Sequence, residues 1–215
     1  ISIKSSMPDS NANFNLNAKV NMAGKYPAVK ADLNLKQVNL QALNFSPTVL
    51  SAAGVVKVDL ATADADYLNG SVDVTGLQLV KDKQRINVDT ISIRAKSTAT
   101  ENELTLKSEV LSAKIDGKYQ LTKVGSAVIN EINKYYAFGT VTKVPDQRLR
   151  FFVQVYDSKL LKNFVPELTV FKQSQFYGLI DTQKDSLQIK GNFPQVVYGD
   201  FKVDTTVLNI NNDNN

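Results

Sequence analysis

Polar and apolar side chains alternate along most of this 215-residue chain, and this alternation limits the folds it can adopt. In residues 104–121, LTLKSEVLSAKIDGKYQL, apolar residues recur two or four positions apart between charged and polar ones. Because successive side chains of a β-strand point to opposite faces, the pattern predicts strands with one apolar and one polar face. The same pattern recurs in 14–22, 28–35, 55–60, 70–79, 85–95, 176–181, 186–191 and 200–210.

The alternation changes phase inside several of these segments. Val72 and Val74 stand in one phase, whereas Leu77 and Leu79 stand in the other, and 85–95 and 104–121 shift in the same way. A slip of one residue would turn every following side chain to the opposite face, so each change predicts a bulge or a turn. Turn-forming residues suited to this role occur at Asp82–Lys83, Thr98–Asn102, Asp116–Gly117 and Lys184–Asp185.

Two segments have helical spacing instead. In residues 122–136, apolar side chains recur three or four positions apart, with Thr122 as the expected N-cap. In residues 157–165, Asp157 is the expected N-cap, and Pro166 is expected to end the helix. The sequence therefore predicts two helices among many strands.

The composition argues against an enzyme. The chain has no Cys and no His, so it lacks thiolates, the commonest general base and the commonest metal ligand. It also has no phosphate-binding, dinucleotide-binding or nucleophile-elbow motif. We therefore expect no catalytic residue, no metal site and no cofactor. Asp64 and Asp66 come nearest to a cation site, but an exposed acidic turn is the expected role.

Charged residues are not gathered into blocks along the chain. Lys and Arg number 25 against 21 Asp and Glu, a net charge of +4, and the lysines stand singly along the alternating segments. This spacing is typical of a solvated face and not of a nucleic-acid footprint, so no nucleic-acid partner is expected. No run of about 18 apolar residues is present, so no transmembrane helix is predicted.

About 12 strands and two short helices predict a mainly β fold in which helices are too few to cover the apolar face. A closed barrel or a two-sheet sandwich would let the sheet cover itself. A long curled sheet, either a taco-like groove or an open β-jelly roll, would instead leave the face free for an apolar guest such as acyl chains. Alternation alone does not distinguish these solutions.

Several stretches resemble the TamB/AsmA-like envelope proteins, in particular the TamB translocation and assembly module family of Bacteroidetes-type bacteria. ADLNLKQVNLQALNF (31–45) is similar to the family's strand followed by a Leu-rich unit, and LNGSVDVTGLQL (68–79) to its recurring strand. Residues 104–136 are similar to a strand–helix block. Residues 166–211 carry a similar turn, and its matching positions are Gly191, Pro194, Val196, Tyr198 and Gly199.

The resemblance implies an internal segment of a cell-envelope protein that spans the periplasm. The full-length protein is expected to be anchored in the inner membrane. The resemblance also implies an apolar groove for phospholipid, or another acyl-chain lipid, moving between the inner and outer membranes, and support of outer-membrane assembly. An outer-membrane barrel partner is implied only through parts outside this chain. We expect a single β-groove segment over 1–215, with sub-blocks 1–121 and 140–215 joined by helix 122–136.

Two sets of side chains are expected at the groove. The lipid-lining set is Val72, Val74, Ile91, Ile93, Leu104, Leu106, Ala113, Ile115, Tyr119, Leu121, Leu187, Ile189, Phe201 and Val203. The set expected to pack the helix onto the groove is Val124, Val128, Ile132 and Tyr135. Two alternatives stay open from the residues: a structural or protein-assembly scaffold with a closed, dry core, and a cell-surface binding β-solenoid.

Overall fold

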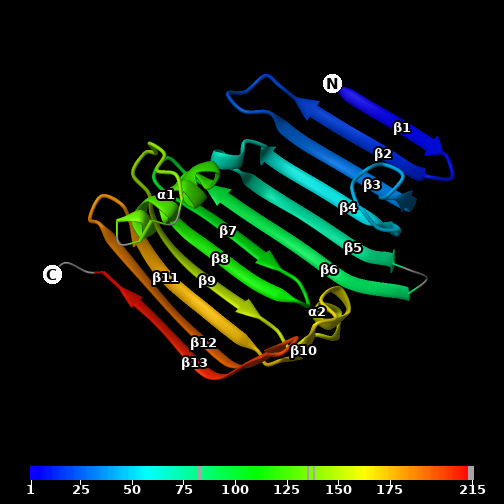
Figure 1. Ribbon diagram of the computed structural model, residues 1–215. Helices are drawn as coiled ribbons and strands as arrows, with labels where there is room; N and C mark the ends of the chain where they lie inside the picture. The colour runs from blue at the N-terminus through cyan, green and yellow to red at the C-terminus, as the bar shows by residue number, and fades with distance from the viewer. Residues whose placement is uncertain (82–83, 135, 138, 213–215) are drawn as a thin grey trace.

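The computed structural model describes residues 1–81, 84–134, 136–137 and 139–212. It is mainly β, with 61% strand and 11% helix, and its described strands form one open antiparallel sheet (Figure 1). The prediction of a curled, mainly β fold with two helices is confirmed, and the sheet is not closed. The strands are β1 (Ser2–Pro8), β2 (Ala12–Asn21), β3 (Ala28–Asn39), β4 (Leu50–Thr62), β5 (Asn69–Lys81), β6 (Gln84–Ser97), β7 (Asn102–Lys107), β8 (Leu111–Lys118), β9 (Arg148–Val155), β10 (Leu168–Phe171), β11 (Ser174–Asp181), β12 (Ser186–Tyr198) and β13 (Phe201–Asn211).

Strand order follows chain order almost throughout. Strands β1 to β9 lie side by side, β11 and β12 continue the sheet, and β13 pairs with the far edge of β12. The short β10 pairs with the last residues of β12, beyond the end of β11. Twelve strands therefore follow one another across the sheet, each antiparallel to the next, with β1 and β13 at its two edges.

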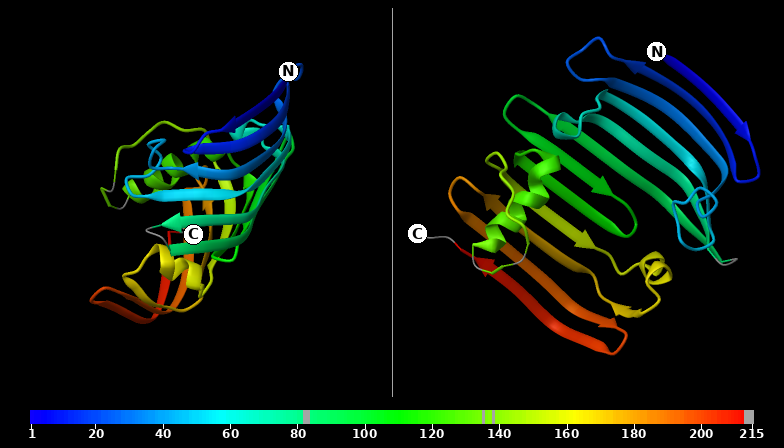
Figure 2. Two further views of the ribbon diagram at one scale, coloured as in Figure 1. Left: turned by 90° about the vertical axis from the view of Figure 1, so that its right-hand side faces the viewer. Right: turned by 45° about the horizontal axis from the view of Figure 1, so that its top comes forward.

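The sheet is curved, and both helices lie on its concave side (Figure 2). Helix α1 (Leu121–Asn133) packs on the part of the sheet formed by β8, β9, β11 and β12. Helix α2 (Lys159–Phe164) lies beside β6. One further element, the 3₁₀ turn η1 (Ala65–Tyr67), links β4 to β5. The described helices thus cover two separate parts of the concave face and leave the remainder uncovered.

The phase change in β5 takes place at a glycine. Gly76 has φ of 57°, a left-handed conformation that glycine adopts without steric cost. The change turns Leu77 to the face that holds Ile91, since both pack against the same buried cluster on β6. The expected bulge is therefore present, and it keeps the apolar residues of both phases on one face.

The phase change in residues 104–121 coincides with a turn between two strands. Ser108 accepts hydrogen bonds from the backbone of Val110 and Leu111 and closes a tight hairpin between β7 and β8. Turns also occur at 98–101 and 182–185, as expected, whereas Asp116 and Gly117 lie inside β8, so the turn expected there was wrong. The turn expected at 82–83 falls outside the described residues.

Helix α1 is capped by a residue from a distant part of the sequence. Its N-cap is Gln120, whose side chain makes no capping bond, so the prediction of Thr122 was wrong. The backbone N–H and hydroxyl of Thr122 instead donate to the carboxylate of Asp66 on η1, each at 2.9 Å. Asp66 thus fixes the start of α1 to the β4–β5 connection, with a negative charge at the helix N-terminus.

The N-cap of helix α2 lies one residue after the expected N-cap. Ser158 is the N-cap, and its hydroxyl accepts a hydrogen bond from the N–H of Leu160 at 3.1 Å. Asp157, predicted for this role, accepts instead from the ammonium of Lys162 at 2.8 Å. Leu160 is buried against β6, which holds this short helix on the concave face.

Two buried clusters form the core, one beneath each helix. Under α1, the cluster is built on Tyr119, Leu149, Ile180 and Leu187. Val124, Val128 and Ile132 of α1 pack against it. Under α2, the cluster is built on Ile86, Val88 and Leu160. Tyr135, expected to complete the stripe on α1, lies outside the described residues.

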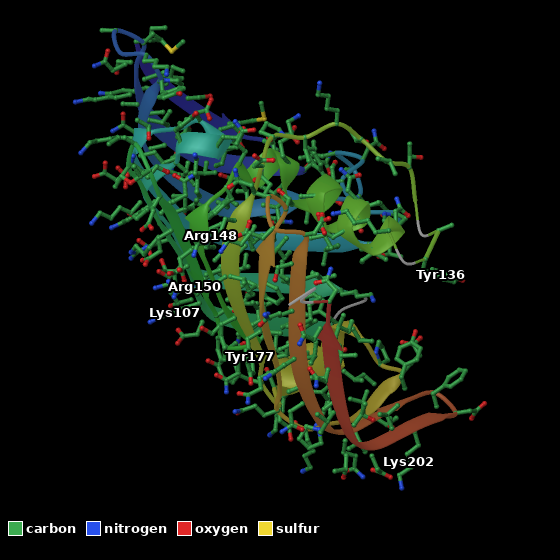
Figure 3. All side chains as sticks on the ribbon, turned by 90° about the vertical axis from the view of Figure 1, so that its left-hand side faces the viewer. Lys107, Tyr136, Arg148, Arg150, Tyr177 and Lys202 are labelled. Carbon is green, nitrogen blue, oxygen red and sulfur yellow. The ribbon has the colours of Figure 1, made fainter. Side chains whose placement is uncertain are left out.

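The convex face carries cross-strand ion pairs. Arg148 and Arg150 of β9 lie on the side of the sheet opposite α1 (Figure 3). Arg150 pairs with Asp116 at 2.5 Å, and Lys114 pairs with Glu103 at 2.7 Å. Such exposed pairs contribute only about 0–1 kcal/mol each, so they add little to stability.

Candidate apolar groove

A continuous row of apolar side chains crosses the concave face from one edge of the sheet to the other. Its members are register partners on consecutive strands: Ile3, Ala18, Ala31, Val58, Val72, Ile93, Leu106, Ala113, Val153, Phe176, Gly191 and Leu208. We call these twelve positions the central row. Every member is apolar or glycine. With strands about 4.8 Å apart, the row is roughly 50 Å long.

A second row lies parallel to the first and is displaced from it by two residues along each strand. We call it the flanking row. It consists of Val20, Val29, Leu60, Gly70, Ala95, Leu104, Ile115, Phe151, Gly178, Ile189 and Ile210. It too contains only apolar residues and glycine. The two rows together form an uncharged strip across the sheet.

The two rows differ in what covers them. Ile115, Phe151 and Ile189 of the flanking row pack against the cluster beneath α1. None of the members of the central row belongs to either described cluster. Ile93 and Leu106 are only partly buried. The central row therefore lies on a part of the concave face that neither buried cluster includes, and it is our candidate for the floor of an apolar groove.

The structure distributes the predicted lining residues among several environments. Val72, Ile93, Leu106 and Ala113 lie in the central row. Leu104, Ile115 and Ile189 lie in the flanking row, and Val74 pairs with Ile91 at the other side of the central row. Tyr119 and Leu187 are buried beneath α1, and Leu121 is the first residue of α1. Phe201 and Val203 are on the exposed edge strand β13.

The sequence-based set missed both ends of the central row. Ile3, Ala18 and Ala31 extend it over β1 to β3, and Phe176 and Leu208 extend it over β11 and β13. Their alternation is visible in the sequence, but alternation assigns a face and not a position along a neighbouring strand. Strand register was the missing information.

Two of the three glycines in the two rows, Gly178 and Gly191, lie beside aromatic rings. A Cβ added at Gly178 would stand 2.8 Å from the ring of Phe151, and one at Gly191 would stand 2.8 Å from the ring of Phe193. The rings thus occupy the space that side chains at these positions would fill. This arrangement keeps the apolar floor continuous where a side chain is missing.

One titratable group lies within the apolar region. Tyr119 is 6% exposed, and burial, followed by the charges of Asp116 and Glu103, raises the pKa of its hydroxyl to about 12. At neutral pH the side chain is therefore uncharged. Its backbone carbonyl accepts from the side-chain amide of Asn102 at 2.6 Å, which holds the segment that leads into α1.

The far end of α1 is held by a buried carboxylate. Glu131 is 2% exposed, and both of its carboxylate oxygens accept from the ammonium of Lys134 at 2.9 Å. Lys134 also donates to Asp185 in the β11–β12 turn. The helix is thus tied to the sheet at its N-terminus through Asp66 and at its C-terminus through Lys134.

The described residues provide no metal cluster and no membrane-crossing helix. Asp64 accepts from the N–H of Asp66 and caps η1, while Asp66 caps α1, so both carboxylates have structural roles. Nowhere in the described ranges do three or more acidic side chains gather at a geometry suited to a metal ion. Neither α1 nor α2 has the length and apolar character needed to cross a membrane.

Comparison with known proteins adds no further assignment. No family model, no curated protein and no solved structure matches the chain. Its function must therefore be inferred from the groove.

Proposed function

We propose that this chain binds and conducts acyl-chain lipid, with phospholipid as the expected guest, along the apolar groove on its concave face. The observation that carries the proposal is the central row, which is uncharged over twelve consecutive strands and lies outside both helix-covered clusters. Fully burying a large apolar side chain is worth roughly 1.5–3 kcal/mol. A long strip left uncovered forgoes much of that stabilisation unless a guest covers it.

The dimensions and chemistry of the groove suit an extended hydrocarbon chain. The strip is roughly 50 Å long, whereas the apolar core of a bilayer is about 30 Å thick. The cross-strand ion pairs Arg94–Asp73, at 2.8 Å, and Lys30–Asp59, at 3.0 Å, lie on the opposite, convex face. Acyl chains on the concave side would therefore meet only apolar side chains along the central row.

The resemblance to TamB/AsmA-like envelope proteins adds the cellular setting to this proposal. In that setting the groove would lie in the periplasm and carry phospholipid between the inner and outer membranes. The sheet is open, as a groove requires, and this favours the lipid path over a scaffold whose sheet closes on a dry core.

The test introduces one carboxylate on each face of β7. Leu106→Glu places a charge in the central row, and Thr105→Glu places the same charge on the convex face, between Arg94 and Lys114. The chain and both variants are incubated with phosphatidylethanolamine and phosphatidylglycerol vesicles, isolated and examined by native mass spectrometry. We expect lipid on the parent and on Thr105→Glu, and little on Leu106→Glu, because an unpaired charge in apolar surroundings costs several kcal/mol.

Three results would contradict the proposal. The first is a parent chain that carries no lipid, and the second is two variants that carry equal amounts. The third is a Leu106→Glu chain that loses its β circular dichroism signal, since position 106 would then be packed core, and the scaffold alternative would be favoured.

A further inference from the structure

Two aromatic side chains lie next to each other on the convex face, away from the groove. Phe152 of β9 and Tyr177 of β11 are register partners, and Tyr177 lies on the side of the sheet opposite α1, as Arg150 does (Figure 3). Phe152 is 38% exposed and Tyr177 is 44% exposed, although both strands have a neighbour on each side. Single exposed apolar residues are common, whereas adjacent ones with a polar rim mark interaction sites.

The two rings form the centre of a row that crosses four strands and has a lysine at each end. Lys114 of β8 is the register partner of Phe152, and Lys190 of β12 is that of Tyr177. Both lysines are exposed. We call these four residues the convex row. Its rings are open to a ligand from above, and its ends carry hydrogen-bond donors.

Hydrogen-bonding groups of both kinds surround the convex row. Gln154 and Gln175, which are register partners two residues away on β9 and β11, supply amides that both donate and accept. On the other side of the row, Arg150 pairs with Asp116 at 2.5 Å. Aromatic rings bordered by amides, carboxylates and cationic donors match a ligand that combines apolar CH faces with many hydroxyl groups.

The charge of this surface is low, because its cations are largely neutralised. Lys114 pairs with Glu103 at 2.7 Å, and Arg150 pairs with Asp116. A single-stranded nucleic acid carries a negative charge on every nucleotide, and the surfaces that bind it combine stacking rings with an excess of positive charge. The balance of charges here therefore favours a ligand of little or no charge.

We propose that the convex row binds an extended β-1,4-linked glycan, with successive sugar rings lying on Phe152 and Tyr177. Neighbouring strands are about 4.8 Å apart, which is close to the length of one hexose in such a chain. A glycan that crosses the strands therefore places one sugar over each aromatic ring. The CH groups of each sugar face contact a ring, and the hydroxyl groups reach the surrounding amides and charged groups.

This site is independent of the lipid proposal, since it lies on the opposite face of the sheet. Isothermal titration calorimetry with three hexasaccharides tests the ligand class. Cellohexaose and chitohexaose are straight β-1,4-linked chains, and maltohexaose is the α-1,4-linked isomer of cellohexaose, with a curved chain. We expect at least one straight chain to bind and maltohexaose to bind more weakly than cellohexaose or not at all. No binding of either straight chain, or equal binding of the two isomers, would overturn the proposal.

An oligothymidylate measured in the same way tests the competing class of ligand. We expect it to bind more weakly than the better of the two straight glycans. Tighter binding of the oligothymidylate, with an affinity that falls steeply as salt is added, would assign the convex row to single-stranded nucleic acid and would overturn the glycan proposal.

Substitutions at position 177 test the ring itself. Tyr177→Phe keeps the ring and should bind the straight glycan about as the parent does, whereas Tyr177→Leu should weaken binding about five- to tenfold. Tyr198→Leu is the matched control, because Tyr198 is 49% exposed and lies outside the convex row, and it should leave the affinity unchanged. Phe152→Leu should behave as Tyr177→Leu does.

Urea unfolding of the same variants separates binding from strand pairing, because aromatic residues on neighbouring strands also stabilise a sheet. We expect all four variants to be folded at zero urea and to differ in affinity as stated. If Tyr177→Leu and Phe152→Leu lose stability but bind the glycan as tightly as the parent, the two rings serve strand pairing alone and the proposal is overturned.

Discussion

Two leucines that differ in burial test whether the central row is open in solution. Leu149 is 2% exposed in the cluster beneath α1, so Leu149→Ala loses the transfer free energy of its side chain and leaves a cavity. Buried Leu→Ala changes cost about 2–5 kcal/mol, and we expect about 3 kcal/mol here. Leu106 is partly buried in the central row, where a truncated side chain faces open space, so we expect about 1 kcal/mol for Leu106→Ala.

Urea unfolding measured by circular dichroism gives both free energies, provided that the slope against urea concentration is the same for each variant. The comparison is internal, since both changes remove the same atoms from strands of the same sheet. A cost for Leu106→Ala equal to or greater than that for Leu149→Ala would refute the open groove. It would mean that another part of the protein packs over the central row.

The remaining predictions concern the attachment of α1. Asp66→Ala should lower the free energy of unfolding by about 1 kcal/mol and speed amide exchange in α1, whereas Asp64→Ala, which caps only η1, should leave that exchange unchanged. The folded pKa of Tyr119, about 12, lies above its ordinary value of 10.0, so its contribution to stability is complete below pH 10 and declines between pH 10 and 12. Tyr119→Phe should therefore lose less stability than the parent over that interval in pH-dependent urea titrations. Lys134→Met should cost at least about 2 kcal/mol in thermal or urea unfolding, because it leaves a buried carboxylate unpaired, and Lys114→Met, in an exposed pair, should cost less than about 1 kcal/mol.

The sequence predicted which elements form, because strand and helix periods are local. The alternation around Val74 and Leu77 correctly indicated a bulge, and the four-residue spacing of Val124, Val128 and Ile132 correctly indicated a helix. It also predicted that two helices would be too few to cover the sheet. These conclusions need only the direction of each side chain along its own element.

Contacts between distant segments could not be predicted from the local sequence pattern. The Asp66–Thr122 cap joins residues 56 positions apart, and neither local sequence marks the other. The central row depends on register between twelve strands, so Phe176 and Leu208 could not be aligned with Leu106 from alternation alone. Tyr119 alternates like a groove residue but is buried by α1, which depends on where the helix packs.

Photo-crosslinking at two adjacent residues of β6 tests the lipid groove most directly. Ile93 lies in the central row, and its neighbour Arg94 lies on the convex face. Benzoylphenylalanine is placed at each position in turn, and the chain is irradiated with phosphatidylethanolamine and phosphatidylglycerol vesicles and analysed by mass spectrometry. Phospholipid adducts at position 93 and few at position 94 are the predicted result. Equal labelling of the two positions, or no labelling at 93, would contradict the proposed path of the acyl chains.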